Sequence, residues 1–225
     1  MNWFPHTKRK CNNIDLEFKQ FAGTHLEDLV GKIVALCKDQ HGCRYLEKIL
    51  EEDVSEHSGI IFRKAFSLFA ELMTNPFGNY LCQKLIEYST NEQQNMICGS
   101  VAHDLVGISL NMHGTRAVQK MIDFLSTQCQ IHSIIMALSM HVVKLIKDLN
   151  RNHVIQKCLN HLIPEDNQFI YNAVAAHCVE VATHCHGCCV LQRCIDHASN
   201  SQRIQLVTEI MFNAQPKPKN LISTH

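Results

Sequence analysis

A ten-residue pattern recurs five times along the chain at an almost constant spacing. Its third residue lies at position 43, 79, 115, 152 or 188, so that successive intervals are 36, 36, 37 and 36 residues. Such spacing is typical of solenoids, in which each unit buries its apolar face by stacking on its neighbours. The segments are HGCRYLEKIL from His41, FGNYLCQKLI from Phe77, HGTRAVQKMI from His113, NRNHVIQKCL from Asn150 and HGCCVLQRCI from His186.

The spacing of apolar residues predicts that every unit is helical. Within the first segment Leu46, Ile49 and Leu50 form one stripe at helical spacing, and the same stripe recurs in the others. A second helical stretch precedes each segment, and connectors rich in Ser, Thr and Asp favour a further short helix. We therefore expect an all-α solenoid with three helices per unit. The preceding stretches are residues 29–37, 62–73, 101–110, 135–146 and 170–182.

Composition narrows the classes of function. The 225 residues contain 21 Lys plus Arg and 21 Asp plus Glu, so any surface for nucleic acid must be local. The 12 Cys are too sparse for a disulfide scaffold and favour a reduced, intracellular compartment. Residues 1–23 have no apolar run of signal-peptide length, and we expect no membrane-spanning segment.

Catalysis and metal binding are not expected. The sequence has no Walker loop, no Gly-x-Ser-x-Gly and no His-Glu-x-x-His, which argues against an enzyme. Cys185-x-x-Cys188 is a candidate zinc or redox pair, with His184, His186, Cys189 and Cys194 nearby. No second pair follows at finger spacing, and the repeat already accounts for three of these cysteines, so we expect neither metal nor cofactor.

Polar and small residues occupy fixed positions on the other face of each segment. Counting from the third residue, the first and fifth positions lie four residues apart and share a helix face. The sixth position is Lys or Arg in every unit. In chain order the first, second, fifth and sixth residues are Cys43, Arg44, Glu47, Lys48; Asn79, Tyr80, Gln83, Lys84; Thr115, Arg116, Gln119, Lys120; Asn152, His153, Gln156, Lys157; and Cys188, Cys189, Gln192, Arg193.

Over about residues 27–211, these residues resemble the Pumilio/FBF (PUF) family of repeat proteins that bind single-stranded RNA. The resemblance implies a right-handed, crescent-shaped solenoid in which two side chains of each repeat read one base edge and a third stacks between bases. It assigns uracil to Asn79 with Gln83 and to Asn152 with Gln156. It assigns adenine to Cys188 with Gln192, and less decisively to Thr115 with Gln119. Cys43 with Glu47 departs from the adenine pair and favours guanine.

The resemblance also assigns roles to the second and sixth positions. Arg44, Tyr80, Arg116 and His153 would stack on bases, for which Cys189 is poorly suited. Because the family binds RNA antiparallel to its repeats, the implied site is 5′-A-U-A-U-(G or A)-3′. A row of basic residues would contact phosphates, with a single-strand salt slope of at most about −3.5 for five contacts. The row is Lys48, Lys84, Lys120, Lys157 and Arg193.

The chain also departs from the family pattern. PUF domains usually have eight repeats, and the later ones read the 5′-UGU of the site. Here we expect five repeats and the beginning of a sixth at Arg203–Phe212, before closely spaced prolines. The expected organisation is an N-terminal extension or partial cap (1–22), a repeat domain (23–212) and a flexible tail (213–225). Arg151 replaces the Gly of the other four segments, which predicts weaker binding.

The resemblance implies binding to mRNA 3′ untranslated regions in the cytoplasm. It further implies repression of translation or promotion of decay through translational repressors or a deadenylase. One alternative is an armadillo- or HEAT-like solenoid that binds a peptide, because Asn and Gln ladders also bind extended chains. A truncated, weakly binding PUF product and a merely solvated polar face are the others.

Overall fold

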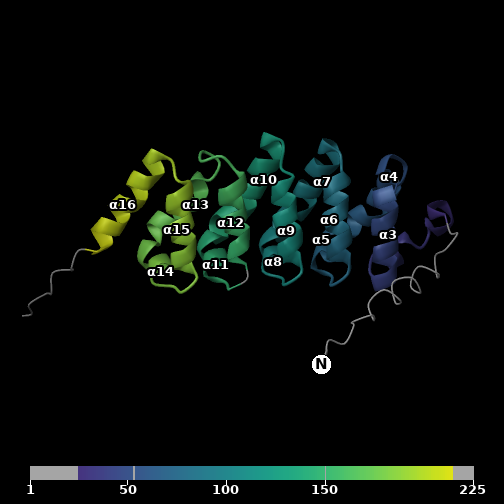
Figure 1. Cartoon of the computed structure of the whole chain (residues 1–225), viewed down its shortest axis with the longest axis horizontal. Coiled ribbons are helices and arrows are strands. Elements are labelled where there is room, and N and C mark those ends of the chain that lie inside the picture. Colours follow the sequence, from purple (N-terminus) through teal and green to yellow (C-terminus); the bar gives the residue numbers. More distant parts are fainter. Residues whose placement is uncertain (1–24, 53, 150, 215–225) are drawn as a thin grey trace, which may run out of the picture.

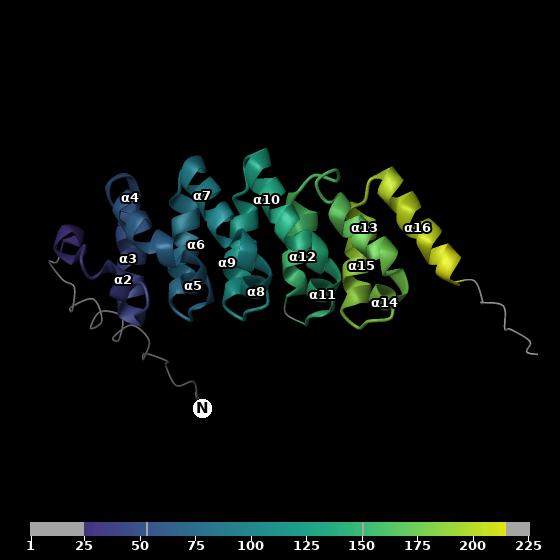
Figure 2. The same ribbon diagram turned by 180° about the vertical axis from the view of Figure 1, so that it is seen from behind.

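The computed structural model describes residues 25–52, 54–149 and 151–214, and throughout these ranges every regular element is a helix. The helices form an elongated row of units that runs from α3 at one end to α16 at the other (Figures 1 and 2). This confirms the predicted all-α solenoid. Residues 1–22, predicted to be an extension or partial cap, lie outside the described ranges.

Each unit contains a short first helix, a second helix that carries the recurring segment, and a third helix. The first helices are α2 (Ile33–Leu36), α5 (Phe69–Thr74), α8 (Leu105–Ser109), α11 (Val142–Lys147) and α14 (Cys178–Ala182). The second helices are α3 (Gln40–Glu52), α6 (Gly78–Tyr88), α9 (Gly114–Asp123), α12 (Asn152–His161) and α15 (Gly187–His197). The third helices are α4 (Val54–Ala65), α7 (Asn91–Val101), α10 (Gln128–Leu138), α13 (Gln168–Ala176) and α16 (Asn200–Ala214).

The core continues from unit to unit. The second helices α3, α6, α9, α12 and α15 pack on one another in chain order, and among the third helices α7 packs on α10 and α13 on α16. The predicted apolar stripe faces this core: Leu46, Val118 and Ile155, from three different units, are fully buried. Each unit thus depends on its neighbours for burial, as expected of a solenoid.

Short 3₁₀ turns mark three of the four boundaries between units, and His177 alone separates α13 from α14 at the fourth. Three of the stretches expected to be single helices are divided by η2 (Phe66–Leu68), η3 (Ala102–Asp104) and η4 (Ser139–His141). Each turn separates the third helix of one unit from the first helix of the next. A fourth turn, η1 (Leu26–Leu29), precedes the first unit and buries Leu26 and Leu29. Apolar periodicity continues across these turns because both flanking helices face the same core.

The structure corrects the prediction that a sixth unit begins at residue 203. Residues 203–212 lie within α16, which is the third helix of the fifth unit and packs on α13 and α14. The segment has the apolar content of a new unit because it occupies the position that α13 occupies one unit earlier. The helix continues to Ala214, so the first two residues of the predicted tail are helical, and residues 215–225 are outside the described ranges.

In the first four units, the side chain four residues before the third residue of the segment accepts hydrogen bonds from backbone N–H groups where the second helix starts. Asp39, Asn75 and Asn111 each accept hydrogen bonds from two backbone N–H groups at this turn, at 2.8–3.0 Å. Asp148 accepts from the Arg151 N–H at 3.2 Å and also pairs with the Arg151 guanidinium at 2.9 Å. The departure at Arg151 therefore preserves the turn, because its side chain adds an ion pair to the cap.

The glycine that follows the turn in four units is explained by close packing. A Cβ atom on Gly187 would overlap the carbonyl oxygen of Val181 at the end of α14, and one on Gly42 or Gly114 would overlap the corresponding oxygen of its own unit. We expect Gly187→Ala to destabilise the protein by about 1–3 kcal/mol, because backbone must move to relieve the overlap. Urea unfolding followed by far-UV circular dichroism measures this change.

Gly99→Ala in α7 is the matched control, because a Cβ there has nothing within 4 Å. Removing a helix-interior glycine is expected to stabilise the protein by about 0.5–1 kcal/mol. Equal stability of the two variants would contradict the packing explanation for Gly187.

One stretch, Gln128–Lys147, is long and apolar enough to cross a membrane by length and composition, with a mean hydropathy of 1.5. In the structure it comprises α10, η4 and α11, and η4 is a boundary between units. Ile134, Leu138 and Leu145 from this stretch are fully buried in the shared core. Packing within the solenoid thus accounts for part of its apolar composition, whereas Met136 and Met140 are exposed.

Candidate nucleic-acid interface

The predicted reading residues lie in corresponding places on five consecutive packed helices. Their degree of exposure follows the position in the segment. The first residues Cys43, Asn79, Thr115 and Asn152 are buried, whereas all second residues, Arg44, Tyr80, Arg116, His153 and Cys189, are exposed. The fifth residues Glu47, Gln83, Gln119 and Gln156 are half-buried. The row thus combines a recessed polar floor with protruding side chains that are mostly planar or basic.

Paired amides form the floor in the second unit. The Asn79 Nδ2 group donates to the backbone oxygens of Asn75 and Pro76, at 2.8 and 3.0 Å. Its Oδ1 accepts a hydrogen bond from Gln83 Nε2 at 3.2 Å. Both amides are therefore held in one orientation, and Gln83 keeps one N–H and its Oε1 for an incoming group.

The fourth unit repeats this arrangement. Asn152 Nδ2 donates to the backbone oxygens of Asp148 and Leu149, at 2.9 and 3.1 Å, and Gln156 Nε2 donates to Asn152 Oδ1 at 2.7 Å. In the third unit a hydroxyl takes the place of the amide, and Gln119 Nε2 donates to Thr115 Oγ1 at 3.3 Å. Three consecutive units thus present a glutamine held by the residue four positions earlier.

The first unit has a different floor. The Cys43 Sγ–H donates to the backbone oxygen of Cys37 at 3.0 Å, and burial raises the pKa of this thiol to about 12, so it stays neutral. Burial also raises the pKa of Glu47 above its ordinary value. The sulfur is committed to the backbone, which leaves the Glu47 carboxyl as the main polar group of this floor.

The fifth unit has the most exposed pair of predicted base-edge residues. Cys188 and Gln192 are both exposed, and Cys188 Sγ lies 3.2 Å from the backbone oxygen of Cys185. Cys189 Sγ approaches the same oxygen at 4.0 Å. Within the described part of the chain, no three His, Cys, Asp or Glu side chains meet in a way that could hold a metal ion, and this includes the Cys185-x-x-Cys188 segment.

Ion pairs between units balance much of the basic row. Lys84 pairs with Glu51 at 2.6 Å, Lys120 with Glu87 at 3.0 Å and Lys157 with Asp123 at 2.7 Å. Each acid lies on the preceding second helix, and Lys48 pairs with Glu52 on its own helix at 3.4 Å. These basic side chains therefore stabilise the stack of units as well as contributing positive charge.

The fifth unit lacks the corresponding ion pair. Asn160 of α12 occupies the position of the three paired acids, and Arg193 has no ion pair with any residue that the structure describes. Sequence reasoning identified the basic row but missed these acids. The signal was present, since Glu51, Glu87 and Asp123 all lie eight residues beyond the first reading position.

A cavity of about 420 Å³ opens between the first and second units. Arg44 and Tyr80, the exposed second residues of these units, line it together with Cys43, Glu47 and Phe77. Tyr80 is 48% exposed, so a large part of its ring is accessible to a flat ligand. The cavity is therefore lined by an exposed guanidinium and an exposed aromatic ring as well as by a half-buried carboxyl group.

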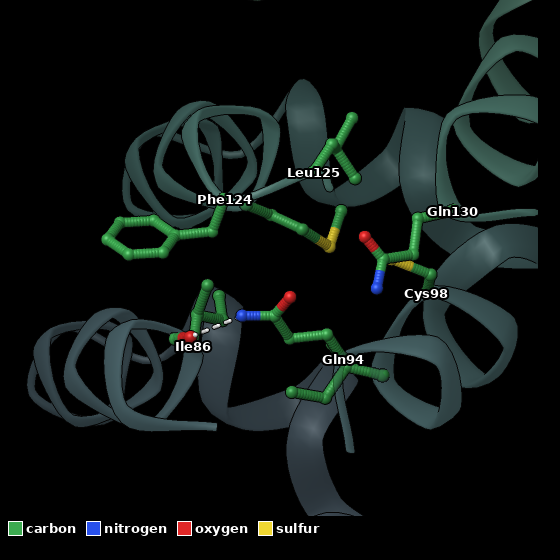
Figure 3. Close-up of a pocket in the computed structure, with 8 residues that line it drawn as sticks. Ile86, Gln94, Cys98, Phe124, Leu125 and Gln130 are labelled. Carbon is green, nitrogen blue, oxygen red and sulfur yellow. Dashed lines mark hydrogen bonds between the residues drawn. The ribbon is translucent and has the colours of Figure 1, made fainter. Parts of the chain in front are cut away.

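A second cavity, between α7 and α9, does not suit an organic ligand. Figure 3 shows it lined by Ile86, Gln94, Cys98, Phe124, Leu125 and Gln130, with Gln94 Nε2 donating to the Ile86 oxygen at 3.2 Å. Its volume of about 10 Å³ holds at most one water molecule. We interpret it as a packing gap between two units.

The fold and the row define a helical repeat protein in which the first four units each offer a recessed polar group and all five offer an exposed planar, basic or small side chain. A family model, the Pumilio-family RNA-binding repeat, matches residues 32–64, 69–102, 104–139, 141–175 and 177–211. These five matches coincide with the five units of the structure. The chain belongs to the Pumilio family.

Individual relatives agree with this assignment. Pumilio domain-containing protein C6G9.14 of Schizosaccharomyces pombe is 52% identical over 81% of this chain, and Pumilio homolog 12 of Arabidopsis thaliana is 43% identical over 90%. The chain covers 27% and 34% of these two proteins. It therefore spans about a third or less of their length.

Solved structures of the family have the same fold. The Puf4 RNA-binding domain, bound to the HO endonuclease RNA 3′ UTR recognition sequence, is 47% identical, with a TM-score of 0.78 over 81% of this chain and 56% of that one. The RNA-binding domain of yeast Puf5p, bound to MFA2 RNA, is 35% identical, with a TM-score of 0.80 over 86% of this chain and 54% of that one.

Proposed function

We propose that this chain binds single-stranded RNA in a sequence-selective manner, with one base at each of five units. The proposal is supported by the matches to domains bound to 3′ UTR recognition sequences and by the row of polar groups on the second helices. The observation that carries it is the pairing of Gln83 with Asn79 and of Gln156 with Asn152. Such preorganised amides need little further ordering when a base binds.

The chemistry of these pairs suits uracil. Each glutamine retains an Oε1 that accepts from the imide N–H of uracil and an N–H that donates to an adjacent carbonyl oxygen. The exposed Arg44, Tyr80, Arg116 and His153 would lie between neighbouring bases. Read antiparallel to the units, the proposed site is 5′-A-U-A-U-(G or A)-3′, with the first unit at the 3′ end.

The cellular role follows as the second part of the proposal. Binding to mRNA 3′ untranslated regions would repress translation or promote decay, through translational repressors or a deadenylase recruited in the cytoplasm. The named 3′ UTR ligands of the related domains support the RNA side of this role. We expect no catalysis by the chain itself.

Fluorescence anisotropy with labelled RNA tests the binding step. We expect tighter binding to 5′-AUAUG than to a shuffled RNA of the same composition, and we expect a 5′-UGUAUAUA probe to show whether UGU adds affinity. The salt slope should be shallower than about −3.5, because several basic side chains are already ion-paired. Equal binding to all RNAs by folded protein would contradict the proposal and favour a peptide-binding solenoid.

A further inference from the structure

The first unit differs from the others in the chemistry of its reading position. Units two to five carry glutamine where this unit carries Glu47. The half-buried Glu47 lines the 420 Å³ cavity together with the exposed Arg44 and Tyr80. A base bound in this cavity would therefore meet a carboxyl group that can exist in two protonation states.

The carboxyl group of Glu47 is left available to a ligand. Among the described residues it has no hydrogen bond or ion pair, and the Cys43 thiol four residues earlier donates to the Cys37 oxygen instead. The nearby cation Lys84 of α6 pairs with Glu51 at 2.6 Å. By contrast, Gln83 and Gln156 are each held by an asparagine.

The surroundings of Glu47 favour the protonated form of its carboxyl group, in comparison with a glutamate in water. Burial raises its pKa, the charge of Lys84 opposes this, Glu51 adds to the rise, and Arg44 opposes it; the pKa is raised overall. The other titratable groups that line the same cavity are the neutral thiol of Cys43 on its own helix and the Tyr80 phenol on α6. Protonation therefore begins at a higher pH than for an ordinary glutamate.

The two states of the carboxyl distinguish purines differently. A carboxylate accepts hydrogen bonds from both N1–H and the 2-amino group of guanine, whereas it faces the N1 lone pair of adenine with repulsion. A protonated carboxyl has one donor and one acceptor, as glutamine has, and can donate to adenine N1 while accepting from its 6-amino group. Acidification thus removes the penalty against adenine.

We propose that Glu47 makes base selection by the first unit pH-dependent, with guanine preferred when the side chain is ionised and adenine accepted once it is protonated. This inference rests on the proposed RNA-binding function. It concerns only the 3′ base of the site, because the other four units carry glutamine.

The test compares two RNAs, 5′-AUAUG and 5′-AUAUA, by fluorescence anisotropy between about pH 5 and pH 8 at one salt concentration. At about pH 7.5 we expect the guanine RNA to bind about fivefold or more tightly, and we expect this ratio to fall towards one at about pH 5. The sign follows from proton uptake, since binding of adenine requires the protonated carboxyl and strengthens as the pH falls.

Glu47→Gln is the matched control. It carries the same histidines, including His153, so any general effect of acid on RNA binding persists in both proteins. The guanine-to-adenine ratio of this variant should be the same at both ends of the pH range. Comparison of two RNAs at each pH also cancels effects on the other four units.

The outcomes separate this inference from the proposed function. Sequence-selective binding with a ratio that does not change with pH in the native protein would overturn the role of Glu47 and leave RNA reading in place. An equal pH dependence of the ratio in Glu47→Gln would also overturn it, since another group would then be responsible. Failure of folded protein to prefer either RNA over a shuffled control would overturn both proposals.

Discussion

Replacing Gln83 and Gln156 together by alanine is expected to weaken binding to 5′-AUAUG by about 2–6 kcal/mol. Each glutamine provides two hydrogen bonds to a uracil, and one such bidentate contact contributes about 1–3 kcal/mol of discrimination. The combined change corresponds to roughly 30-fold to 20,000-fold in affinity. The loss should be accompanied by relaxed selection at the two uracil positions, because Asn79 and Asn152 direct their amide N–H groups to the backbone.

Anisotropy titrations of the double variant with the uracil-containing RNA, and with RNAs that carry cytosine at these positions, measure both effects. Gln128→Ala in α10 is the control, since this exposed glutamine begins a third helix, away from the reading row. The control should bind as the native chain does. Unchanged affinity of a folded double variant would refute the assigned role of the two glutamines.

Replacing Tyr171 by alanine is expected to cause the largest loss of stability, about 3–5 kcal/mol. Tyr171 is fully buried on α13, and its hydroxyl donates to the Cys194 oxygen of α15 at 2.9 Å. The alanine variant loses ring burial, leaves a cavity between two units and leaves a buried carbonyl without its partner. Burial raises the pKa of the Tyr171 phenol well above its ordinary value, so the donor is retained at neutral pH.

Tyr171→Phe separates packing from hydrogen bonding. It keeps the ring and removes only the hydroxyl, so its expected cost is about 0.5–1.5 kcal/mol. Urea unfolding measures both variants. Because units of a solenoid are stabilised mainly by their neighbours, amide hydrogen exchange should show the loss concentrated in the fourth and fifth units. Similar costs for the two variants would show that the ring contributes little.

Much of the architecture could be predicted from the sequence because a solenoid contains mostly local information. Constant spacing of the apolar stripe located five second helices, and the same register located the polar floor and the exposed row. The boundaries between units are harder to predict from the sequence. The helices on either side of η2 or η4 face one continuous core, so apolar periodicity passes through the turn unchanged, and residues 203–212 were assigned to a new unit for the same reason.

By itself the sequence determined the helical class, the order of the five second helices and the position of each proposed base-contacting side chain along them, since these depend on repeat spacing within one chain. Only the tertiary structure decided which groups are already engaged. Lys84, Lys120 and Lys157 meet acids of the preceding helix, whereas the carboxyl of Glu47 has no such partner among the residues that the structure describes. These relations join residues of different units, and distances between units arise only when the helices pack.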